Sequence, residues 1–299
     1  MKLVYIVSAY KLPDQLVRLV SRLNTGTAFF LIHVDKKTDE AVFRRMREPL
    51  RHLTNVHFLE RHRCPYGGFG HVRATLKGID EIVRRGLPFD YVILLTGQDY
   101  PIKTNQHIEE FFSRNEGRSF MEHFPLPSDG WAGGGMDRIE SWHVRLGGTH
   151  LRIPGAARGT LRRLPPGLRP FGGSSYWCLS RECIEYVETF LSRSPSYARF
   201  FKYFIVPDEH FFHTILLNSP LKDTIVNDDL HYLEWRDPDV AGGPAVLGKN
   251  DYDKIMSAGD LFARKFDMTT DSELLDMIDA AIADACMSAD LTSPRSHAT

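Results

Sequence analysis

Two adjacent cations near the C-terminal end of the sequence form a candidate anion site. Arg264 and Lys265 lie in the segment LFARKFD, where apolar residues alternate as in a β-strand and no carboxylate is placed as an obvious partner. Arginine offers a planar fork that matches two phosphate oxygens, and lysine adds a compact charge. The pair therefore predicts a diphosphate site that uses protein cations instead of a metal. The alternative is a charged strand edge that discourages aggregation.

The geometry of a strand restricts this diphosphate hypothesis. Successive side chains of a strand point to opposite faces. Arg264 and Lys265 can therefore reach one ligand only at a strand end or in a twisted segment.

Asp-x-Asp strings are the possible metal-binding alternative to a site made of protein cations. Enzymes that transfer a sugar from a nucleotide commonly hold a divalent cation with Asp-x-Asp at the end of a middle strand. Here that position reads GQD, so Gly97 replaces the first carboxylate and Asp99 stands alone. Two Asp-x-Asp strings occur later, where turn chemistry and the helix dipole explain acidic residues; they are Asp237 with Asp239 and Asp251 with Asp253. The sequence thus predicts no metal and no other cofactor.

The segment VPDEHFFHT contains a candidate general base. Pro207, Asp208 and Glu209 are expected in the first turn of a helix, where acidic residues also simply complement the dipole. The residues after them are strongly apolar, which would partly desolvate Glu209. A desolvated carboxylate has a raised pKa, as deprotonation of a hydroxyl near neutral pH requires.

Two other functions remain open from the residues alone. His210 and His213 are three apart on the same predicted helix and would suit a metal-dependent hydrolase, although EHFFH is not the HExxH order of zinc peptidases. A carbohydrate-binding protein without catalysis is the other alternative. Measured metal content would identify the hydrolase. A protein that only binds carbohydrate would release no nucleotide from a nucleotide-sugar.

Alternating strand and helix patterns in the first half predict an α/β fold with a mostly parallel, Rossmann-like sheet and helices on both faces. Ligands of such sheets bind beyond the carboxyl ends of the strands. We therefore expect Ser8, Asp35, Tyr66 and the segment after Thr96 to converge. The expected strands are 3–9, 28–34, 56–59 and 91–96, and the expected helices begin at Pro13 and at about His71.

The second half is expected to complete a single domain over residues 1–289. Its parts are a nucleotide-binding part at about 1–123, an irregular acceptor lobe at 124–173 rich in glycine and arginine, an acceptor and catalytic part at 174–289, and a flexible tail at 290–299. Within 174–289 we expect a strand at 174–179, helices from Arg181 and Pro207, strand-like TIV and LHYLEW segments, and a last amphipathic helix in SELLDMIDAAIADA.

Composition excludes several classes of protein. A net charge of -1 and a pI near 6.9 argue against nucleic-acid binding. The four cysteines have neither zinc-site spacing nor the density of a disulfide scaffold, so reduced thiols are expected. Without a signal peptide or a run of about 18 to 20 apolar residues, the chain is expected to be cytoplasmic, with peripheral contact at the inner face of a membrane left open. The oligomeric state is not predicted.

Five strings resemble the core-2/I-branching β-1,6-N-acetylglucosaminyltransferases and peptide O-xylosyltransferases. They occur in the order of that family and extend over most of the chain: IHVDKK at 32–37, TGQDYPIKTN at 96–105, GGSSYWCLSRE at 172–182, PDEHFFHTILLNSP at 207–220 and LFARKFD at 261–267. The resemblance implies a GT-A type fold, inversion at the anomeric carbon and metal independence. It implies a UDP-sugar donor, with N-acetylglucosamine as first choice and xylose as second, and a β linkage to a saccharide or glycoside hydroxyl.

The resemblance also assigns roles to individual residues. Glu209 matches the catalytic base, and Arg264 with Lys265 match the diphosphate-binding pair. The other positions are Val7, Asp35 and Tyr66 toward the nucleotide, Asp99 toward the sugar, and Glu122 with Trp235 toward the acceptor. Eukaryotic members carry a membrane anchor and several disulfides, and neither feature is expected from this sequence. We therefore expect a bacterial-type enzyme that acts on a cell-surface glycan or a small glycoside.

Overall fold

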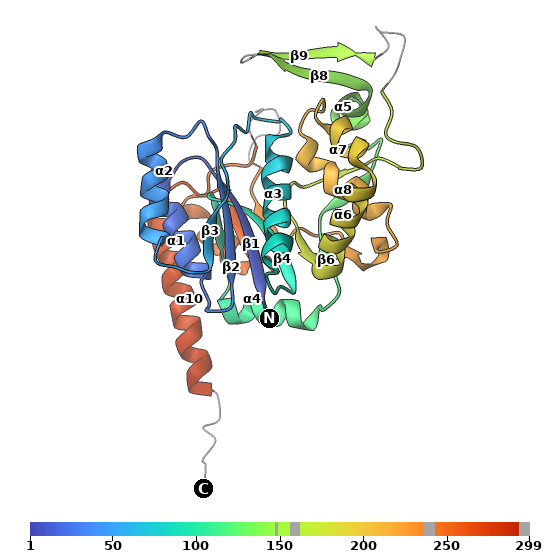
Figure 1. Ribbon diagram of the computed structural model, residues 1–299. Coiled ribbons are helices and arrows are strands. Elements are labelled where there is room, and N and C mark those ends of the chain that lie inside the picture. The colour runs from blue at the N-terminus through green and yellow to red at the C-terminus, as the bar shows by residue number, and fades with distance from the viewer. Residues whose placement is uncertain (147–148, 156–161, 236–242, 293–299) are drawn as a thin grey trace.

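A seven-stranded sheet forms the centre of the molecule (Figure 1). The computed structural model describes residues 1–146, 149–155, 162–235 and 243–292. The strand order is β12-β6-β11-β4-β1-β2-β3. β1 pairs in parallel with β2 and β4, β2 with β3, and β6 with β12, whereas β11 runs antiparallel to both neighbours. The predicted mostly parallel sheet is confirmed.

Both faces of the sheet are buried, as the continuous apolar run of β1 requires. Alternate side chains of this strand enter two different hydrophobic clusters, Tyr5 and Val7 one and Val4 and Ile6 the other. The first cluster includes residues of α1 and α10, and the second includes residues of α3, α6 and α8. Helices therefore cover both faces of the sheet, as predicted (Figure 1).

The first half of the chain follows the predicted order of elements closely. The bounds are β1 Leu3–Ala9, α1 Pro13–Leu23, β2 Phe29–Val34, α2 Glu40–Arg47, β3 Val56–Phe58, α3 Gly70–Arg85, β4 Tyr91–Thr96, β5 Asp99–Pro101, α4 Asn105–Arg114, β6 Ser119–Phe120 and β7 His123–Pro125. Periodicity located β1, α1, β2, β3, α3 and β4, most of which have a strongly buried face or are buried throughout. The short elements α2, β5, α4, β6 and β7 were not predicted.

The lobe at 124–173 contains more regular structure than expected. Its elements are α5 Asp137–Glu140, the antiparallel hairpin β8 Ser141–Leu146 with β9 Thr149–Pro154, and β10 Phe171–Gly173, which pairs with β7. The hairpin extends away from the central sheet at the top of Figure 1. Exposed residues dominate β9, although polar and apolar residues alternate in both strands of the hairpin, so this strand signal was missed.

Later elements differ from expectation at their boundaries. They are β11 Cys178–Ser180, α6 Arg181–Arg193, α7 Pro195–Phe201, α8 Phe211–Leu217, β12 Ile225–Val226, β13 His231–Leu233, α9 Tyr252–Ser257, β14 Phe262–Arg264 and α10 Glu273–Thr292. The strand expected at 174–179 begins only at Cys178. The helix expected from Pro207 is a separate 3-10 turn, η4 Pro207–Glu209, and α8 begins after His210. α10 also continues through Thr292, past the predicted start of the tail at 290.

A small second sheet completes the frame around the site. Its order is β13-β14-β5, with β14 parallel to β13 and antiparallel to β5. This register places Arg264 directly opposite Asp99. The LFARKFD segment is thereby joined to the GQD segment, although the two lie far apart in the sequence.

Two expectations about the whole chain can be compared with the described residues. The four cysteines, Cys64, Cys178, Cys183 and Cys286, are free thiols, as expected. In the part of the chain that the structure describes, no helix combines the length and apolar character needed to cross a membrane.

Candidate active site

A cavity of about 680 Å³ opens beyond the carboxyl ends of β1, β2 and β4. Ala9, Asp35 and Thr96, at the ends of these three strands, all contribute to its lining. The convergence predicted from the strand order is therefore observed. The size of the cavity is within the range that accommodates a cofactor or nucleotide-sized ligand.

Most of the residues proposed from the sequence line this cavity. They are Asp35, Tyr66, Glu122, Glu209, Trp235, Arg264 and Lys265. Val7 and Asp99 do not: the Val7 side chain is buried in the core, and the neighbouring Ser8 faces the cavity instead. Asp99 is completely buried behind Arg264. The proposed direct contact of Asp99 with the sugar is thus corrected to a contact with Arg264.

Arg264 is held by a buried network. Its Nη1 donates to Asp99 Oδ1 at 2.6 Å and to Thr96 Oγ1 at 2.7 Å, and its guanidinium lies 4.6 Å from the ring centroid of Tyr176. The expectation that Arg264 has no carboxylate partner was wrong, because Asp99 reaches it from β5, which is distant in the sequence. Cation and carboxylate compensate each other and fix the guanidinium at the end of β14.

Lys265 supplies the charge that this ion pair does not. Among the described residues, no carboxylate lies within ion-pair distance of its ammonium, whereas nearby Lys11 is paired with Asp267 at 2.6 Å. Burial, followed by the cations Arg264 and Lys11, lowers the pKa of Lys265. An unpaired ammonium beside a second cation at a cavity wall favours binding of a phosphate group. Because β14 ends at Arg264, both side chains reach one cavity.

Glu209 lies in the η4 turn and contacts a residue of the lobe. Arg138 Nη1 donates to Glu209 Oε2 at 2.5 Å, and the Arg138 guanidinium lies 3.9 Å from the ring centroid of Trp131. Burial raises the pKa of Glu209 to about 7, although Arg138 acts in the opposite direction. The carboxylate is therefore near the protonation balance that suits a general base at neutral pH.

Two further carboxylates lie in the same cavity. Asp208 accepts a hydrogen bond from Ser175 Oγ at 3.0 Å. Burial raises the pKa of Glu122, and the nearby carboxylates Asp229 and Asp228 raise it further. Carboxylates repel phosphate groups but accept hydrogen bonds from hydroxyls. This acidic wall therefore suits contacts with a sugar.

Gly173 allows the wall that carries Glu122 to close. A Cβ at this position would lie 1.9 Å from the Glu122 carbonyl oxygen and 2.8 Å from His213 Nε2. Glycine is therefore required where β10 passes β7. The GGSS segment has a packing function that its sequence alone does not reveal.

Asp35, Tyr66 and Trp235, which all line the cavity, differ greatly in exposure. Asp35 is buried, and its Oδ1 accepts from the backbone N–H of Lys37 at 2.8 Å. Tyr66 and Trp235 remain 80% and 61% exposed, respectively. Exposed aromatic rings at a cavity rim are available for stacking on a base or a sugar.

The histidine pair proposed for a hydrolase is not arranged as a metal site at the cavity. His210 and His213 are both buried, burial lowers the pKa of each, and neither lines the cavity. His210 instead packs against Trp131 and Phe204 at 5.0 and 4.8 Å between ring centroids. His210 Nε2 also lies 3.4 Å from Arg138 Nη1, the atom that donates to Glu209.

Of the two late Asp-x-Asp strings, only Asp251 with Asp253 lies in the part of the chain that the structure describes. Asp251 Oδ2 accepts from the backbone N–H of Gly248 at 2.8 Å, as expected for a carboxylate at a helix start. Asp237 and Asp239 lie outside the described residues.

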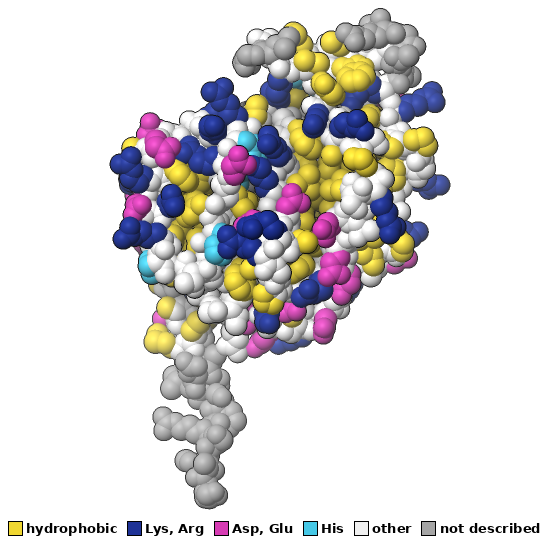
Figure 2. Space-filling model, viewed as in Figure 1, with side chains coloured by type: hydrophobic (Ala, Val, Ile, Leu, Met, Phe, Trp, Pro, Cys, Tyr) yellow, Lys and Arg dark blue, Asp and Glu magenta, His cyan; other side chains and the backbone are white. Residues whose placement is uncertain are grey.

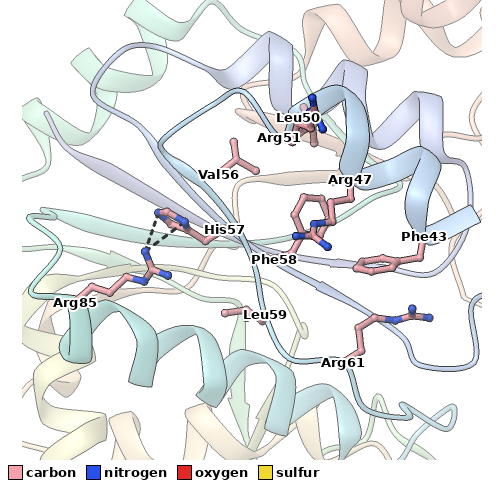
Figure 3. A pocket seen from close by; sticks show the side chains of 10 residues that line it. All are labelled: Phe43, Arg47, Leu50, Arg51, Val56, His57, Phe58, Leu59, Arg61 and Arg85. Carbon is pink, nitrogen blue, oxygen red and sulfur yellow. Dashed lines mark hydrogen bonds between the residues drawn. The ribbon is translucent and has the colours of Figure 1, made fainter. Parts of the chain in front are cut away.

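A second cavity, of about 490 Å³, lies between α2, β3 and the end of α3 (Figure 3). Four arginines surround its apolar floor: Arg47, Arg51, Arg61 and Arg85. Three of them are paired with acidic residues of the same region. On the face that Figure 2 shows, basic and acidic side chains are mixed in the region of α2. This cavity contains none of the residues predicted for the site.

Comparison with known proteins identifies the family. The model of the Core-2/I-Branching enzyme family matches residues 3–256 of the chain. The chain belongs to this family. Core-2/I-branching enzymes have a fold of the GT-A type, and the mainly parallel sheet with helices on both faces agrees with it.

Individual relatives of this core-2/I-branching family member are similar over only part of their own length. Xylosyltransferase 2 of Rattus norvegicus is 29% identical over 289 residues, and xylosyltransferase 1 of Homo sapiens is 27% identical over 288 residues. Each alignment covers 89% of this chain, but only 32% and 28% of the respective relative. The chain thus spans about a third of the length of these proteins.

Some residues at the site of this family member were not found from the sequence. Arg138, Trp131 and Tyr176 contact or support the proposed functional residues. The only local signal was the high arginine content of the lobe, which does not specify which arginine contacts Glu209. Lys11 had a better signal, since it follows the first predicted strand closely.

Proposed function

We propose that this protein is an inverting glycosyltransferase that transfers a sugar from a UDP-sugar to a hydroxyl of a saccharide or glycoside without a metal. The observation that carries the proposal is that one cavity holds both Glu209, with a pKa raised to about 7, and the cations Arg264 and Lys265. Family membership supports the reaction class.

The proposed reaction is a single in-line displacement. Glu209 accepts the proton of the acceptor hydroxyl as its oxygen attacks the anomeric carbon. The bond from that carbon to the UDP oxygen breaks, and the electron pair leaves with UDP. Arg264 and Lys265 stabilise the charge that develops on the diphosphate. Attack from the opposite side inverts the anomeric centre and gives a β linkage from an α-linked donor.

The donor is proposed to be UDP-N-acetylglucosamine or UDP-xylose. The resemblance favours the first, whereas the named relatives are xylosyltransferases, which gives support to the second. A thermal-shift panel of UDP-sugars, followed by a UDP-release assay with the stabilising donors, distinguishes them. A protein that only binds carbohydrate would release no UDP with any donor and acceptor pair.

Substitution of the base tests the proposed function directly. Glu209→Gln should retain UDP binding but lose turnover on the order of 100-fold or more. Glu185→Gln is the matched control, because Glu185 lies on α6 outside the cavity, paired with Arg181. Turnover of Glu209→Gln at the level of this control would contradict the assignment of the base.

A further inference from the structure

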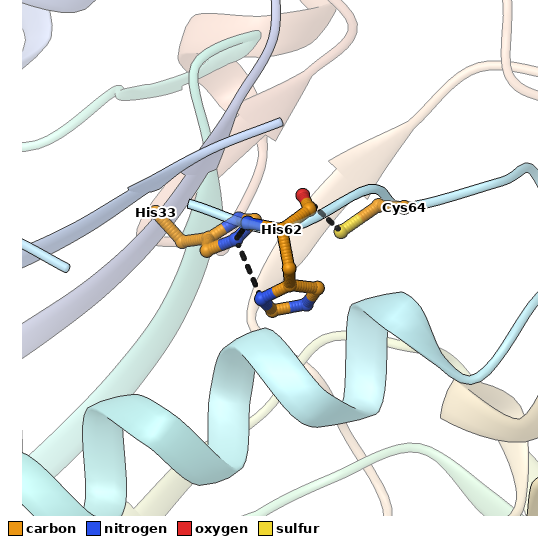
Figure 4. A group of neighbouring side chains, drawn as sticks. All are labelled: His33, His62 and Cys64. Carbon is orange, nitrogen blue, oxygen red and sulfur yellow. Dashed lines mark hydrogen bonds between the residues drawn. The ribbon is translucent and has the colours of Figure 1, made fainter. Parts of the chain in front are cut away.

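Three potential metal ligands lie together beneath the nucleotide side of the cavity (Figure 4). They are His33 on β2, and His62 and Cys64 in the loop after β3. One ligand atom from each lies within 4.8 Å of the other two, and all three side chains are buried. Among the described residues, this is the one group of three such donors that meets these distances.

The two rings face each other, and their nitrogens take part in three short polar contacts. His62 Nε2 is 2.9 Å from the Gly70 carbonyl, which can only accept, so the ring proton of neutral His62 lies on Nε2 and Nδ1 keeps a lone pair. That Nδ1 lies 3.0 Å from His33 Nε2. The backbone N–H of His62 also points at His33 Nε2, at 3.2 Å.

No placement of protons on the two neutral rings satisfies all three contacts. A proton on His33 Nε2 would face the backbone N–H, and its absence would leave two lone pairs facing each other. A proton on His33 Nε2 satisfies the contact to His62 Nδ1 and leaves only the backbone N–H of His62 without its acceptor. A cation between the ring nitrogens would replace that proton with two coordinate bonds, and the same longest contact is lost. The hydrogen bond from His62 to Gly70 then has the role of the outer contact that orients a metal-binding histidine.

We propose that His33 Nε2, His62 Nδ1 and Cys64 Sγ form a site for a transition-metal ion that prefers nitrogen and sulfur ligands, with Zn²⁺ as the representative ion. Imidazole and thiolate select such ions over Mg²⁺ or Ca²⁺. In a tetrahedral zinc site two nitrogen ligands are about 3.3 Å apart, so the rings need to separate by only a few tenths of an ångström.

The backbone around the three donors is closely packed. A Cβ on Gly70 would lie 2.7 Å from the Cys64 Cα and 2.8 Å from the Arg63 carbonyl oxygen. Only glycine therefore lets the start of α3 approach the loop that carries His62 and Cys64. Donors on packed backbone are held in place, as a preformed site requires.

The cavity gives the ion access and a fourth ligand. His33 and Cys64 both line it, next to Asp35, so a water molecule can complete the coordination from that side. On binding, the Cys64 thiol loses its proton to solvent, and the resulting thiolate forms the bond to sulfur. Asp35 favours a cation there, while Lys37, Arg73 and Lys77 oppose it.

This site is independent of the proposed transfer reaction, which assigns the diphosphate to Arg264 and Lys265. Removal of the ion should leave glycosyl transfer intact, so the two proposals fail separately. Because transfer activity does not report on the metal site, the site must be detected by a measurement on the bound ion.

Cobalt is the spectroscopic probe. Protein carrying Cys286→Ser, which removes the exposed thiol, is stripped with a chelator and titrated with Co²⁺. We expect a thiolate-to-cobalt charge-transfer band and visible d–d bands that saturate at one ion per chain and disappear on addition of Zn²⁺. The further substitution Cys64→Ser should abolish the charge-transfer band. It should also weaken Co²⁺ binding by about 10-fold to 100-fold. Cys183→Ser, at a buried thiol on α6, should leave both unchanged.

Proton release tests the site without any change to its ligands. In weakly buffered solution at neutral pH, binding of one Co²⁺ should release one proton, because a free thiol is protonated at this pH and binds a metal as the thiolate. Binding without the charge-transfer band or without proton release, or a band that persists in Cys64→Ser, would overturn the proposal. So would failure to bind Co²⁺ at all.

Discussion

The Arg264–Asp99 pair combines structural and proposed functional roles in a single contact. Asp99 is completely buried, and its partner guanidinium is mostly buried as well. A buried ion pair contributes little net stability, but removal of one member leaves the other charge uncompensated. Substitution of Arg264 is therefore expected to affect both the stability of the fold and ligand binding. An experiment on Arg264 must separate these two effects.

Arg264→Met should lower the free energy of unfolding by about 3 to 5 kcal/mol, because Asp99 would remain buried and unpaired. The double substitution Arg264→Met with Asp99→Asn should recover most of this loss in denaturant titrations. UDP binding and turnover should not recover, because the cation is still missing. Recovery of turnover in the double variant would show that the guanidinium is only structural.

Lys265 permits a cleaner test of charge. Since it has no ion-pair partner among the described residues, Lys265→Met should leave stability nearly unchanged. Loss of a charge-stabilising group should lower kcat on the order of 100-fold. Lys254→Met, at an exposed lysine of α9 outside the cavity, is the control in the same UDP-release assay.

At the scale of elements, the lobe at 124–173 and the η4 turn meet at the proposed base. Arg138 lies in α5, Glu209 lies in η4, and Trp131 packs on the arginine. Both segments affect the pKa of Glu209. Burial of Glu209 in η4 raises this pKa, and Arg138 of the lobe lowers it. The proton affinity of the base therefore depends on contact between the two elements.

The pH dependence of turnover should report this contact. A base must be deprotonated, so kcat/KM should decrease as pH falls through about 7, by about tenfold per pH unit well below it. Arg138 lowers the pKa of Glu209, so Arg138→Met should move the midpoint to higher pH. Arg163→Met, at an exposed arginine of the same lobe, should leave it in place. An unchanged midpoint in Arg138→Met would remove Arg138 from the positioning of the base.

The crossing of β10 and β7 is a second contact between elements that is open to test. Gly173→Ala would force its Cβ against the Glu122 carbonyl, with an expected loss of about 1 to 3 kcal/mol in the free energy of unfolding. Gly26→Ala is the control, because a Cβ there meets nothing within 4 Å. Equal stability of the two variants in thermal denaturation would contradict the packing argument.

At the scale of the whole molecule, the parallel sheet brings its strand ends to one edge, and the small β13-β14-β5 sheet adds the cations from the far end of the chain. Charge for the diphosphate is thus available from protein groups. UDP release should consequently survive treatment with EDTA. Loss of activity that manganese restores would contradict metal independence, whereas loss that only zinc restores would contradict the independence of the His33, His62 and Cys64 site from the transfer reaction.

Much of the frame could be predicted because hydrophobic periodicity is a local property. The buried runs of β1, β2 and β4, and the apolar stripe of α1, identify themselves within a few residues of sequence. The 3-10 break at His210 was missed because apolar residues continue through it without a change of pattern. The β8–β9 hairpin was missed although SWHVRL alternates as a strand does, because the glycine and arginine content of the lobe indicated irregular structure.

The sequence by itself determined the α/β class, the polar strand ends and the missing first carboxylate of GQD, because each depends on residues that are close neighbours along the chain. Only the tertiary structure decided that Asp99 pairs with Arg264, that Arg138 reaches Glu209, and that His33 faces His62. These contacts depend on strand register and on the approach of distant segments, which burial of the whole core establishes. The same approach placed Val7 in that core and Asp99 behind the cavity wall.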